Sequence, residues 1–255
     1  MIGRNTEIDE FHALVQAINE KLGPSRGIDS ADVDENELQQ LMEAYTSNES
    51  EWSRYFFASD KIPYTRNLVD KGNGKSNLSS ARRSDCVRRS IDRCVSTGDK
   101  PVRRPHSDKP NNTSKRNALH VNFESTDTHG STNRNRMLTL HSHANAHCIM
   151  KVLRGRLTET RFATPTDEDV QNQRPMTKTC ETTYSENQVT YMADTLGTHR
   201  ISNPDPTEYA VSLHLYTPPN AATYGCNVFN EENSGIVHNK QCHFFSEYGV
   251  KVTRD

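Results

Sequence analysis

The sequence predicts a mainly β protein, a sandwich or barrel preceded by short helices, and three observations lead to this prediction. After Cys148, short apolar or alternating runs are separated by Gly, Pro, Asn and Asp, which is typical of strands joined by turns. Before residue 60, apolar residues recur at helical spacing. The chain of 255 residues is only 32% hydrophobic, so we expect one domain, residues 1–255, of which part lies outside the core.

Two helices are expected in the N-terminal part, residues 1–60. The first begins with Thr6 as its N-cap, with Asp9 three residues later, and ends at Gly23. Its apolar side consists of Ile8, Phe11, Leu14, Val15, Ile18 and Leu22. The second helix starts near Asp34. Its apolar side consists of Leu38, Leu41, Met42 and Tyr45, and the aromatic segment EWSRYFF follows. Both stripes are expected to contact a core and to have no direct role in function.

A basic segment, about residues 76–136, separates the helical part from the strands. It holds thirteen basic residues against six acidic ones, a net charge of +7 in a chain whose total is −2. Such a segment buries too little apolar surface to offset its ordering entropy and is expected to be largely disordered. Its charge would suit a nucleic-acid-binding arm. However, Phe123 is its only aromatic residue, so a platform for stacking bases is missing and a passively tolerated insertion is favoured. Only ALHVNF, residues 118–123, alternates like a strand.

Four runs in the last part of the chain predict strands: CIMKVLRG, TETRFATP, NQVTYMAD and YAVSLHLYTPP. Gly155, between the first two runs, indicates a hairpin turn that joins them. Pro218 and Pro219 end the last run. A cis bond before Pro218 is left open by the sequence.

Three histidines predict a metal site. His141 and His143 stand two apart in HSHANAHC, and on a strand this spacing puts both imidazoles on one face. With His199 of LGTHRISN they would form a facial three-nitrogen site with open positions for a substrate and for oxygen. Such ligands accept iron, zinc, copper or nickel. A His-x-His pair alone is weak evidence in a chain with eleven histidines.

The run AVSLHLY carries a second set of polar side chains. Ser212, His214 and Tyr216 alternate along it, so on one strand they face the same side and form a hydroxyl, imidazole and phenol relay. Taken singly, Tyr216 would be an ordinary core residue of a strand. Cys148 taken singly would be a small buried hydrophobe.

The sequence also excludes several classes of protein. The first residues lack an apolar stretch of signal-peptide length, and no run of ~18 apolar residues marks a membrane span. We therefore expect a cytoplasmic protein that does not bind membranes. The cysteines occur without a CxxC pair, so neither a zinc ribbon nor a disulfide framework is indicated. They are Cys86, Cys94, Cys148, Cys180, Cys226 and Cys242.

Four motifs, in this order, resemble segments of the eukaryotic cysteine dioxygenases: YTRNLVDKGNGK, LHSHANAHC, LGTHRISN and AVSLHLYTPP. The resemblance covers the chain except for the basic segment. It implies a cupin fold, a small β-barrel of jelly-roll type preceded by short helices. It also implies a reaction in which both atoms of O₂ are added to the thiol of L-cysteine. The product is cysteine sulfinic acid, on the route of cysteine catabolism to taurine.

The resemblance assigns roles to individual residues. His141, His143 and His199 would be the ligands of Fe(II). Arg66 and Tyr64 would bind the substrate, with the Arg66 guanidinium gripping the carboxylate through two hydrogen bonds.

The resemblance likewise makes Tyr216, with His214 and Ser212, the catalytic group that stabilises or protonates the reacting oxygen and contacts the substrate. Cys148 would be joined to Tyr216 by a thioether, which holds the phenol in place and lowers its pKa. L-cysteine and O₂ are the expected partners of a monomer that binds no nucleic acid.

The chain departs from the family between GNGK and the His-x-His pair. Relatives have an apolar strand and a glycine-rich turn there, whereas this chain has the basic segment. The abrupt change resembles a retained intervening sequence or a gene-model error more than an evolved loop, and peptides covering residues 83–134 in a digest of the source cells would refute that hypothesis. As written, the chain must recruit ALHVNF or RMLTL as a substitute strand, or leave a gap beside the metal.

Two other functions remain open. A catalytically impaired or inactive metal-binding cupin would keep the histidines without oxidising cysteine, because the insertion replaces a barrel strand. Another thiol or small-acid dioxygenase would consume oxygen with a different substrate. Arg66 and Tyr216 argue against the second alternative, since they suit an amino-acid carboxylate.

Overall fold

The computed structural model describes residues 8–23, 34–59, 64–71, 118–124, 139–239 and 244–252. For residues 118–124 it describes the backbone. All described elements belong to one compact unit, formed from residues 1–74 and 115–255. The expected disorder of residues 76–136 falls almost wholly outside the described residues.

The two predicted N-terminal helices are present, and a third short helix with a 3₁₀ turn forms at the aromatic segment, where no helix was predicted. The three helices are α1 (Glu10–Leu22), α2 (Glu35–Ala44) and α3 (Glu49–Trp52), followed by the 3₁₀ turn (Ser53–Tyr55). The N-cap of α1 is Asp9, whose carboxylate accepts the backbone N–H of His12; the predicted cap, Thr6, lies outside the described residues. Ile8 precedes the helix and is 61% exposed, so its predicted place in the apolar stripe was wrong. The other five members of that stripe are buried.

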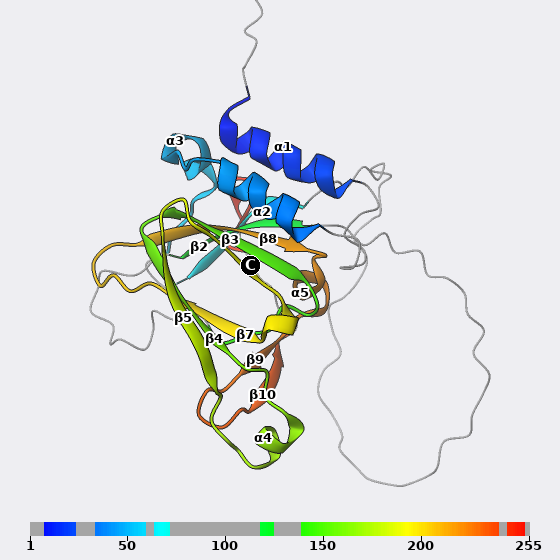
Figure 1. Ribbon diagram of the computed structural model, residues 1–255. Coiled ribbons are helices and arrows are strands. Elements are labelled where there is room, and N and C mark those ends of the chain that lie inside the picture. The colour runs from blue at the N-terminus through cyan, green and yellow to red at the C-terminus, as the bar shows by residue number, and fades with distance from the viewer. Residues whose placement is uncertain are drawn as a thin grey trace, which may run out of the picture. The chain divides into compact units, whose positions relative to one another are not determined.

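The strands form two main sheets and a hairpin (Figure 1). The larger sheet has the order β12-β11-β1-β2-β8-β3-β6 and the smaller one β5-β4-β7, while β9 pairs with β10. The strands are β1 (Thr65–Asp70), β2 (Ala118–Glu124), β3 (His147–Arg154), β4 (Arg156–Phe162), β5 (Lys178–Ser185), β6 (Val189–Met192), β7 (Thr198–Ser202), β8 (Ala210–Thr217), β9 (Cys226–Phe229), β10 (Ile236–Asn239), β11 (Ser246–Glu247) and β12 (Val250–Lys251). Short helices α4 (Asp167–Gln171) and α5 (Asn220–Tyr224) and a 3₁₀ turn (Asp194–Leu196) lie in the connections. The predicted mainly β fold with short N-terminal helices is confirmed.

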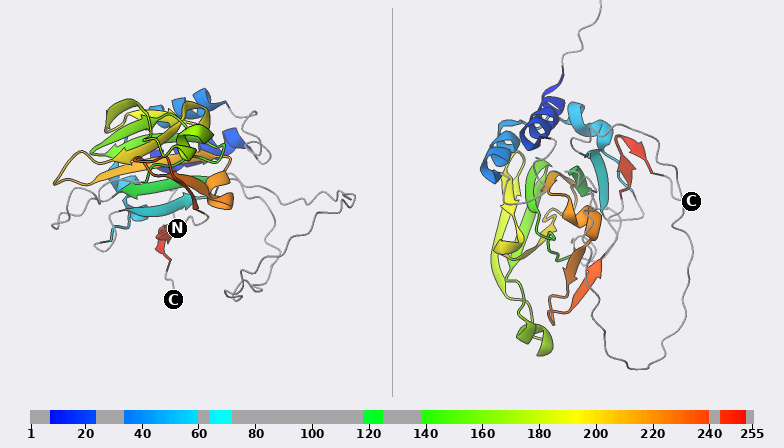
Figure 2. Two further views of the ribbon diagram at one scale, coloured as in Figure 1. Left: turned by 90° about the horizontal axis from the view of Figure 1, so that it is seen from below. Right: turned by 90° about the vertical axis from the view of Figure 1, so that its right-hand side faces the viewer.

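The larger sheet is covered on one face by the helices (Figure 1 and Figure 2). Alternation along β8 explains this, since Val211, Leu213 and Leu215 join the core cluster of α1 and α2. The residues between them, Ser212 and His214, therefore point to the opposite face. That second face packs against the smaller sheet through Met150, Val152, Leu157, Ile201 and Ala210.

Gly155 does not form a hairpin turn, which corrects the sequence prediction. The strands on either side of it belong to different sheets: β3 pairs with β6 and β8, and β4 pairs with β5 and β7. Gly155 is a corner where the chain passes between sheets, with a φ of 75°. A Cβ there would lie 3.0 Å from the carbonyl oxygen of Tyr209, so glycine is required for conformation and for space.

The substitute strand expected from the alternation of ALHVNF is present as β2. It pairs antiparallel with β1, where Val121 faces Asn67, and antiparallel with β8, where Leu119 faces Leu215. This strand from the basic segment thus lies in the larger sheet between β1 and β8, the strand that carries the polar relay.

The open question at Pro218 is answered by a cis bond between Thr217 and Pro218. Among the helices of the described ranges, none is long and apolar enough to cross a membrane.

Candidate metal centre

Three histidines converge between the two sheets. His141, His143 and His199 are 7%, 0% and 2% exposed, and one ring nitrogen of each lies within 4.8 Å of the others. Their ring centroids are 4.7 to 5.2 Å apart. A set of three buried imidazoles at this spacing has the donor chemistry of a transition-metal site.

The backbone around the first two histidines differs from the prediction. They were expected on a strand, but His141 makes only isolated bridges, to His199 of β7 and Val228 of β9. His143 lies two residues on, directly before a turn at Ala144 and Asn145. The extended stretch is long enough to put both rings on one side, and the chain then turns away from the site.

The rings of His141 and His199 are oriented by their own hydrogen bonds. Nδ1 of His141 donates to the carbonyl oxygen of Thr139 at 2.8 Å, and Nδ1 of His199 donates to Glu159 at 2.7 Å. Each therefore presents Nε2 as the remaining ligand atom. Neither ring nitrogen of the buried His143 has a hydrogen-bond partner. An unpaired buried imidazole is costly without a ligand, so this residue fits a metal ion.

Burial keeps the metal-facing imidazoles neutral. It lowers the pKa of His143 to about 4. The pKa of His141 is also well below its ordinary value, first because of burial and then because of its neighbours His199 and His143. The neutral imidazole is the form that binds a metal.

Glu159 of β4 is an acid that we did not identify from the sequence. Its side chain is 1% exposed. One oxygen accepts from His199, and the other accepts from Arg161 at 2.9 Å and from Thr190 at 3.0 Å. Burial raises its pKa, but the hydrogen bonds and charges of His199 and Arg161 outweigh burial and lower it to about 2. The available signal was its spacing from Leu157, which puts an acid on the inward face of the strand.

The polar relay on β8 forms a continuous row. The hydroxyl of Ser212 lies 2.9 Å from Nε2 of His214, and the hydroxyl of Tyr216 lies 3.4 Å from Nδ1 of the same ring. The rings of His214 and Tyr216 are stacked with centroids 5.9 Å apart. The Tyr216 ring is also stacked on that of His143, at 6.0 Å, so the row reaches the histidine site.

Cys148 and Tyr216 are direct partners across the ladder between β3 and β8. Residues paired in this way have their side chains on the same face. The Cys148 sulfur lies 3.9 Å from Nδ1 of His214, and the residue is 1% exposed. Burial raises the pKa of the thiol to about 12 and the pKa of Tyr216 well above its ordinary value, so both groups are protonated at neutral pH.

Arg66 on β1 brings a positive charge to the same interior. Its Nε donates to the hydroxyl of Tyr64 at 2.8 Å, and its guanidinium lies 5.4 Å from the Tyr64 ring centroid. Burial is the largest influence on the pKa values of Cys148 and Tyr216, and the charge of Arg66 lowers both. The arginine is thus near enough to the relay to act on it electrostatically.

Comparison with known proteins places this site in a family. The family model of cysteine dioxygenase type I matches residues 22–80 and 134–232. The chain belongs to the cysteine dioxygenase family. It is 33% identical over 221 residues to cysteine dioxygenase type 1 of Homo sapiens, covering 87% of this chain and 82% of the relative. The match to the Danio rerio protein is 33% over 223 residues, with coverages of 88% and 83%. Membership and the three-histidine site together identify an enzyme of the non-haem iron dioxygenase class, with a cupin fold.

The family match has a gap that coincides with the basic segment. The two matched ranges leave out residues 81–133, and the segment defined by composition runs from about 76 to 136. All three histidines lie inside the second matched range, and Arg66 lies inside the first. Strand β2 lies in this gap, so this chain forms part of the larger sheet from residues that the family model does not match.

Proposed function

We propose that this chain is a cysteine dioxygenase, which uses Fe(II) and O₂ to oxidise L-cysteine to cysteine sulfinic acid in cysteine catabolism. The observation that carries the proposal is the convergence of three buried histidines with the Cys148–Tyr216 pair. The balance is simple: both atoms of one O₂ are added to the sulfur, and no other oxidant or reductant is consumed.

His141, His143 and His199 would hold the iron through neutral imidazole nitrogens. When bound, Fe(II) supplies the one-electron chemistry that lets dioxygen react with a thiol. Three neutral ligands add no negative charge, which favours an anionic thiolate as a further ligand. The described residues therefore fit a metal that takes its substrate through the sulfur.

Arg66 and Tyr64 would bind the amino-acid end of the substrate. A guanidinium grips a carboxylate through two parallel hydrogen bonds. Nε of Arg66 is used by the Tyr64 hydroxyl, which fixes the plane of the group. Arg66 would thus orient cysteine without itself moving a proton.

Tyr216, His214 and Ser212 would handle a proton beside the substrate. If Ser212 donates to Nε2 of His214, then Nδ1 of His214 carries hydrogen and donates to the Tyr216 oxygen. The phenol hydrogen can then point elsewhere, toward the substrate. Because burial raises the pKa of Tyr216 well above 10, the phenol keeps this hydrogen at neutral pH.

Cys148 and Tyr216 would form a thioether crosslink. The carbon–sulfur bond forms as the S–H and one ring C–H bond break, with loss of two hydrogen atoms, that is two protons and two electrons, which dioxygen would take up as hydrogen peroxide. The cross-strand pairing of the two residues supports the bond, since it needs no change of register. The crosslink would hold the phenol at one position.

The alternative is a metal-binding cupin with impaired activity, since the family's strand before the His-x-His pair is replaced. In this chain β2 pairs with β1 on one side and with β8 on the other. It can therefore replace the family's strand, which supports an active enzyme. The test is oxygen uptake by iron-loaded protein with L-cysteine, beside His141→Ala and Arg66→Ala. We expect uptake by the wild type, loss in the first variant, and a raised KM in the second. Wild-type uptake equal to the His141→Ala background would refute the proposal.

A further inference from the structure

The loop after the second histidine has a strained backbone. Ala144 and Asn145 have φ values of 53° and 60°, two consecutive left-handed residues without a glycine. This region is unfavourable for Ala144 and less so for Asn145, because asparagine tolerates it better than most residues with a Cβ; Ala144 keeps it only when its surroundings hold the turn. The turn begins directly after His143, so its conformation determines where that residue lies.

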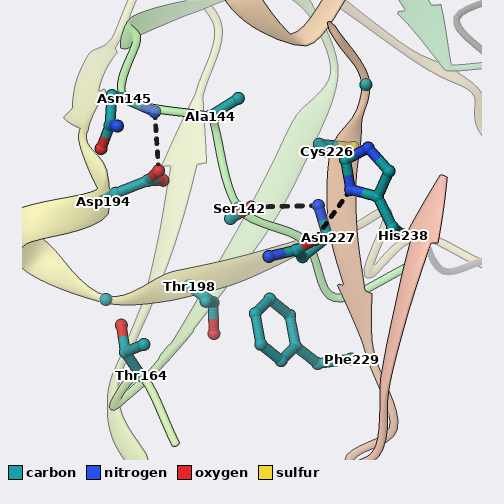
Figure 3. Close-up of a pocket in the computed structure, with 12 residues that line it drawn as sticks. Ser142, Ala144, Asn145, Thr164, Asp194, Thr198, Cys226, Asn227, Phe229 and His238 are labelled. Atoms are coloured by element: carbon teal, nitrogen blue, oxygen red, sulfur yellow. Dashed lines mark hydrogen bonds between the residues drawn. The ribbon is translucent and has the colours of Figure 1, made fainter. Parts of the chain in front are cut away.

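Side chains from two other elements hold this turn. The carboxylate of Asp194, in the 3₁₀ turn after β6, accepts the backbone N–H of His143 at 2.6 Å and that of Asn145 at 2.8 Å. Figure 3 shows the second of these bonds at the edge of a cavity of about 310 Å³. The Asn220 side chain donates to the carbonyl oxygen of Ala144 at 2.8 Å. Three successive residues of the turn are thus held by side-chain hydrogen bonds.

The position of the His143 ring depends on the conformation of its backbone more than the positions of the His141 and His199 rings do. The rings of His141 and His199 are oriented by hydrogen bonds at Nδ1. The ring of His143 has no such bond, and its Nδ1 lies 3.7 Å from the nearest Asp194 oxygen. The position of its ring is therefore set through the main chain together with this longer contact to the same carboxylate. Burial has the largest effect on the pKa of His143 and lowers it, whereas this contact raises it.

We propose that Asp194 is a positioning residue for the metal site, which acts by holding the left-handed turn that places His143. This rests on the proposed function only in so far as the three histidines bind a metal. Asp194 itself contacts neither metal nor substrate in this role. A missing Asp194 would let the turn relax and would move His143 out of reach of the other two ligands.

The test is to measure the affinity of the full chain for Fe(II) and for Co(II) in variants that change Asp194, the turn or a control residue. Asp194→Ala removes both acceptors, and Asp194→Asn, which has the same shape, keeps one acceptor and no charge. The double variant Asp194→Ala/Ala144→Gly adds a residue that adopts the left-handed region without strain. Asp205→Ala is the control, because Asp205 also accepts two backbone N–H groups, at 2.9 and 3.0 Å, in the loop between β7 and β8.

We expect Asp194→Ala to weaken metal binding about 10- to 100-fold, the usual effect of losing an outer partner of a ligand, and Asp194→Asn to fall between it and the wild type. Ala144→Gly should restore most of the loss, and the Asp205→Ala control should bind metal like the wild type. Equal losses in Asp194→Ala and Asp205→Ala would overturn the proposal. So would a failure of Ala144→Gly to restore binding, because Asp194 would then act by some route other than the turn.

Amide hydrogen exchange of the metal-free protein separates this proposal from the proposed function. If Asp194 holds the turn, the amides of His143 and Asn145 exchange faster in Asp194→Asn than in the wild type, whether or not metal is bound. Unchanged exchange would overturn the proposal. If the wild type binds no metal and Asp194→Asn still exchanges faster than the wild type at these amides, the proposed function is refuted, and Asp194 remains the residue that holds the turn.

Discussion

Replacing Glu159 by glutamine should weaken the metal site, although the two side chains have the same shape. The carboxylate oxygens have separate tasks: one accepts from Nδ1 of His199, and the other accepts from Arg161 and Thr190. An amide has only one acceptor. If its oxygen keeps the His199 bond, its NH₂ group faces the Arg161 guanidinium. If the amide is flipped, its NH₂ faces Nδ1 of His199 and favours the tautomer with hydrogen on Nε2, which is the ligand atom.

Either orientation of the amide in Glu159→Gln should lower the free energy of unfolding or the metal affinity by a measurable amount. A buried donor left unsatisfied costs about 1–3 kcal/mol of unfolding free energy. Loss of a partner that orients a metal-bound histidine typically weakens metal binding about 10- to 100-fold, which corresponds to about 1.4–2.8 kcal/mol. We expect both effects in Glu159→Gln: either orientation leaves a buried donor unsatisfied, and even an amide oxygen that keeps the His199 bond is a weaker, uncharged acceptor that orients the ring less well.

The assay is metal titration with Co(II) or Fe(II), combined with chemical denaturation of the metal-free protein. Glu181→Gln is the matched control, since Glu181 lies on β5 next to β4, accepts from Lys178 and Thr160, and is 47% exposed. Replacing Glu181 by glutamine should lower the free energy of unfolding by at most about 0.5 kcal/mol and leave metal affinity unchanged. Metal binding by Glu159→Gln as tight as by Glu181→Gln would refute the role of Glu159 in orienting His199.

Three further outcomes are expected. Val121→Pro removes a ladder donor from β2, which pairs on both sides, and should lower the unfolding free energy by at least about 1 kcal/mol in denaturant titrations; unchanged stability would mean that β2 does not form. The pKa of Glu159 is about 2 instead of 4.5, so its contribution to stability is complete above pH 4.5 and is lost as the pH falls toward 2. The stability difference between wild type and Glu159→Gln should therefore shrink over that range, and a difference independent of pH would contradict the assignment. Cys148→Ser should abolish any mass loss of two hydrogen atoms that appears during turnover, and a loss that persists would show that Tyr216 is not crosslinked to Cys148.

Much of the fold could be predicted because its local periods are strong. The 3.6-residue period located α1 and α2, and the alternation of ALHVNF located β2 inside a segment that is otherwise polar. The pairing of strands could not be predicted in this way, because alternation within one strand does not show which other strands lie beside it in the sheet. Gly155 was therefore taken for a hairpin turn, whereas the strands beside it pair with partners distant in the sequence.

The site was predicted less completely than the fold. The histidines and the relay were found because motifs of adjacent residues signal them. Glu159 and Asp194 were missed because their partners are 40 and 51 residues away in the chain. The sequence also placed His141 and His143 on a strand, since spacing alone cannot distinguish a strand from an extended stretch that ends in a turn.

Oxygen consumption and sulfinate formation should be measured together on the intact chain after loading with Fe(II), with L-cysteine as the substrate and intact mass confirming that residues 76–136 are present. We predict one cysteine sulfinate formed for each O₂ consumed, with both labelled atoms in the product when ¹⁸O₂ is supplied. Product at the level of His141→Ala, or sulfinate that carries oxygen from water, would contradict the proposal that this chain is a cysteine dioxygenase.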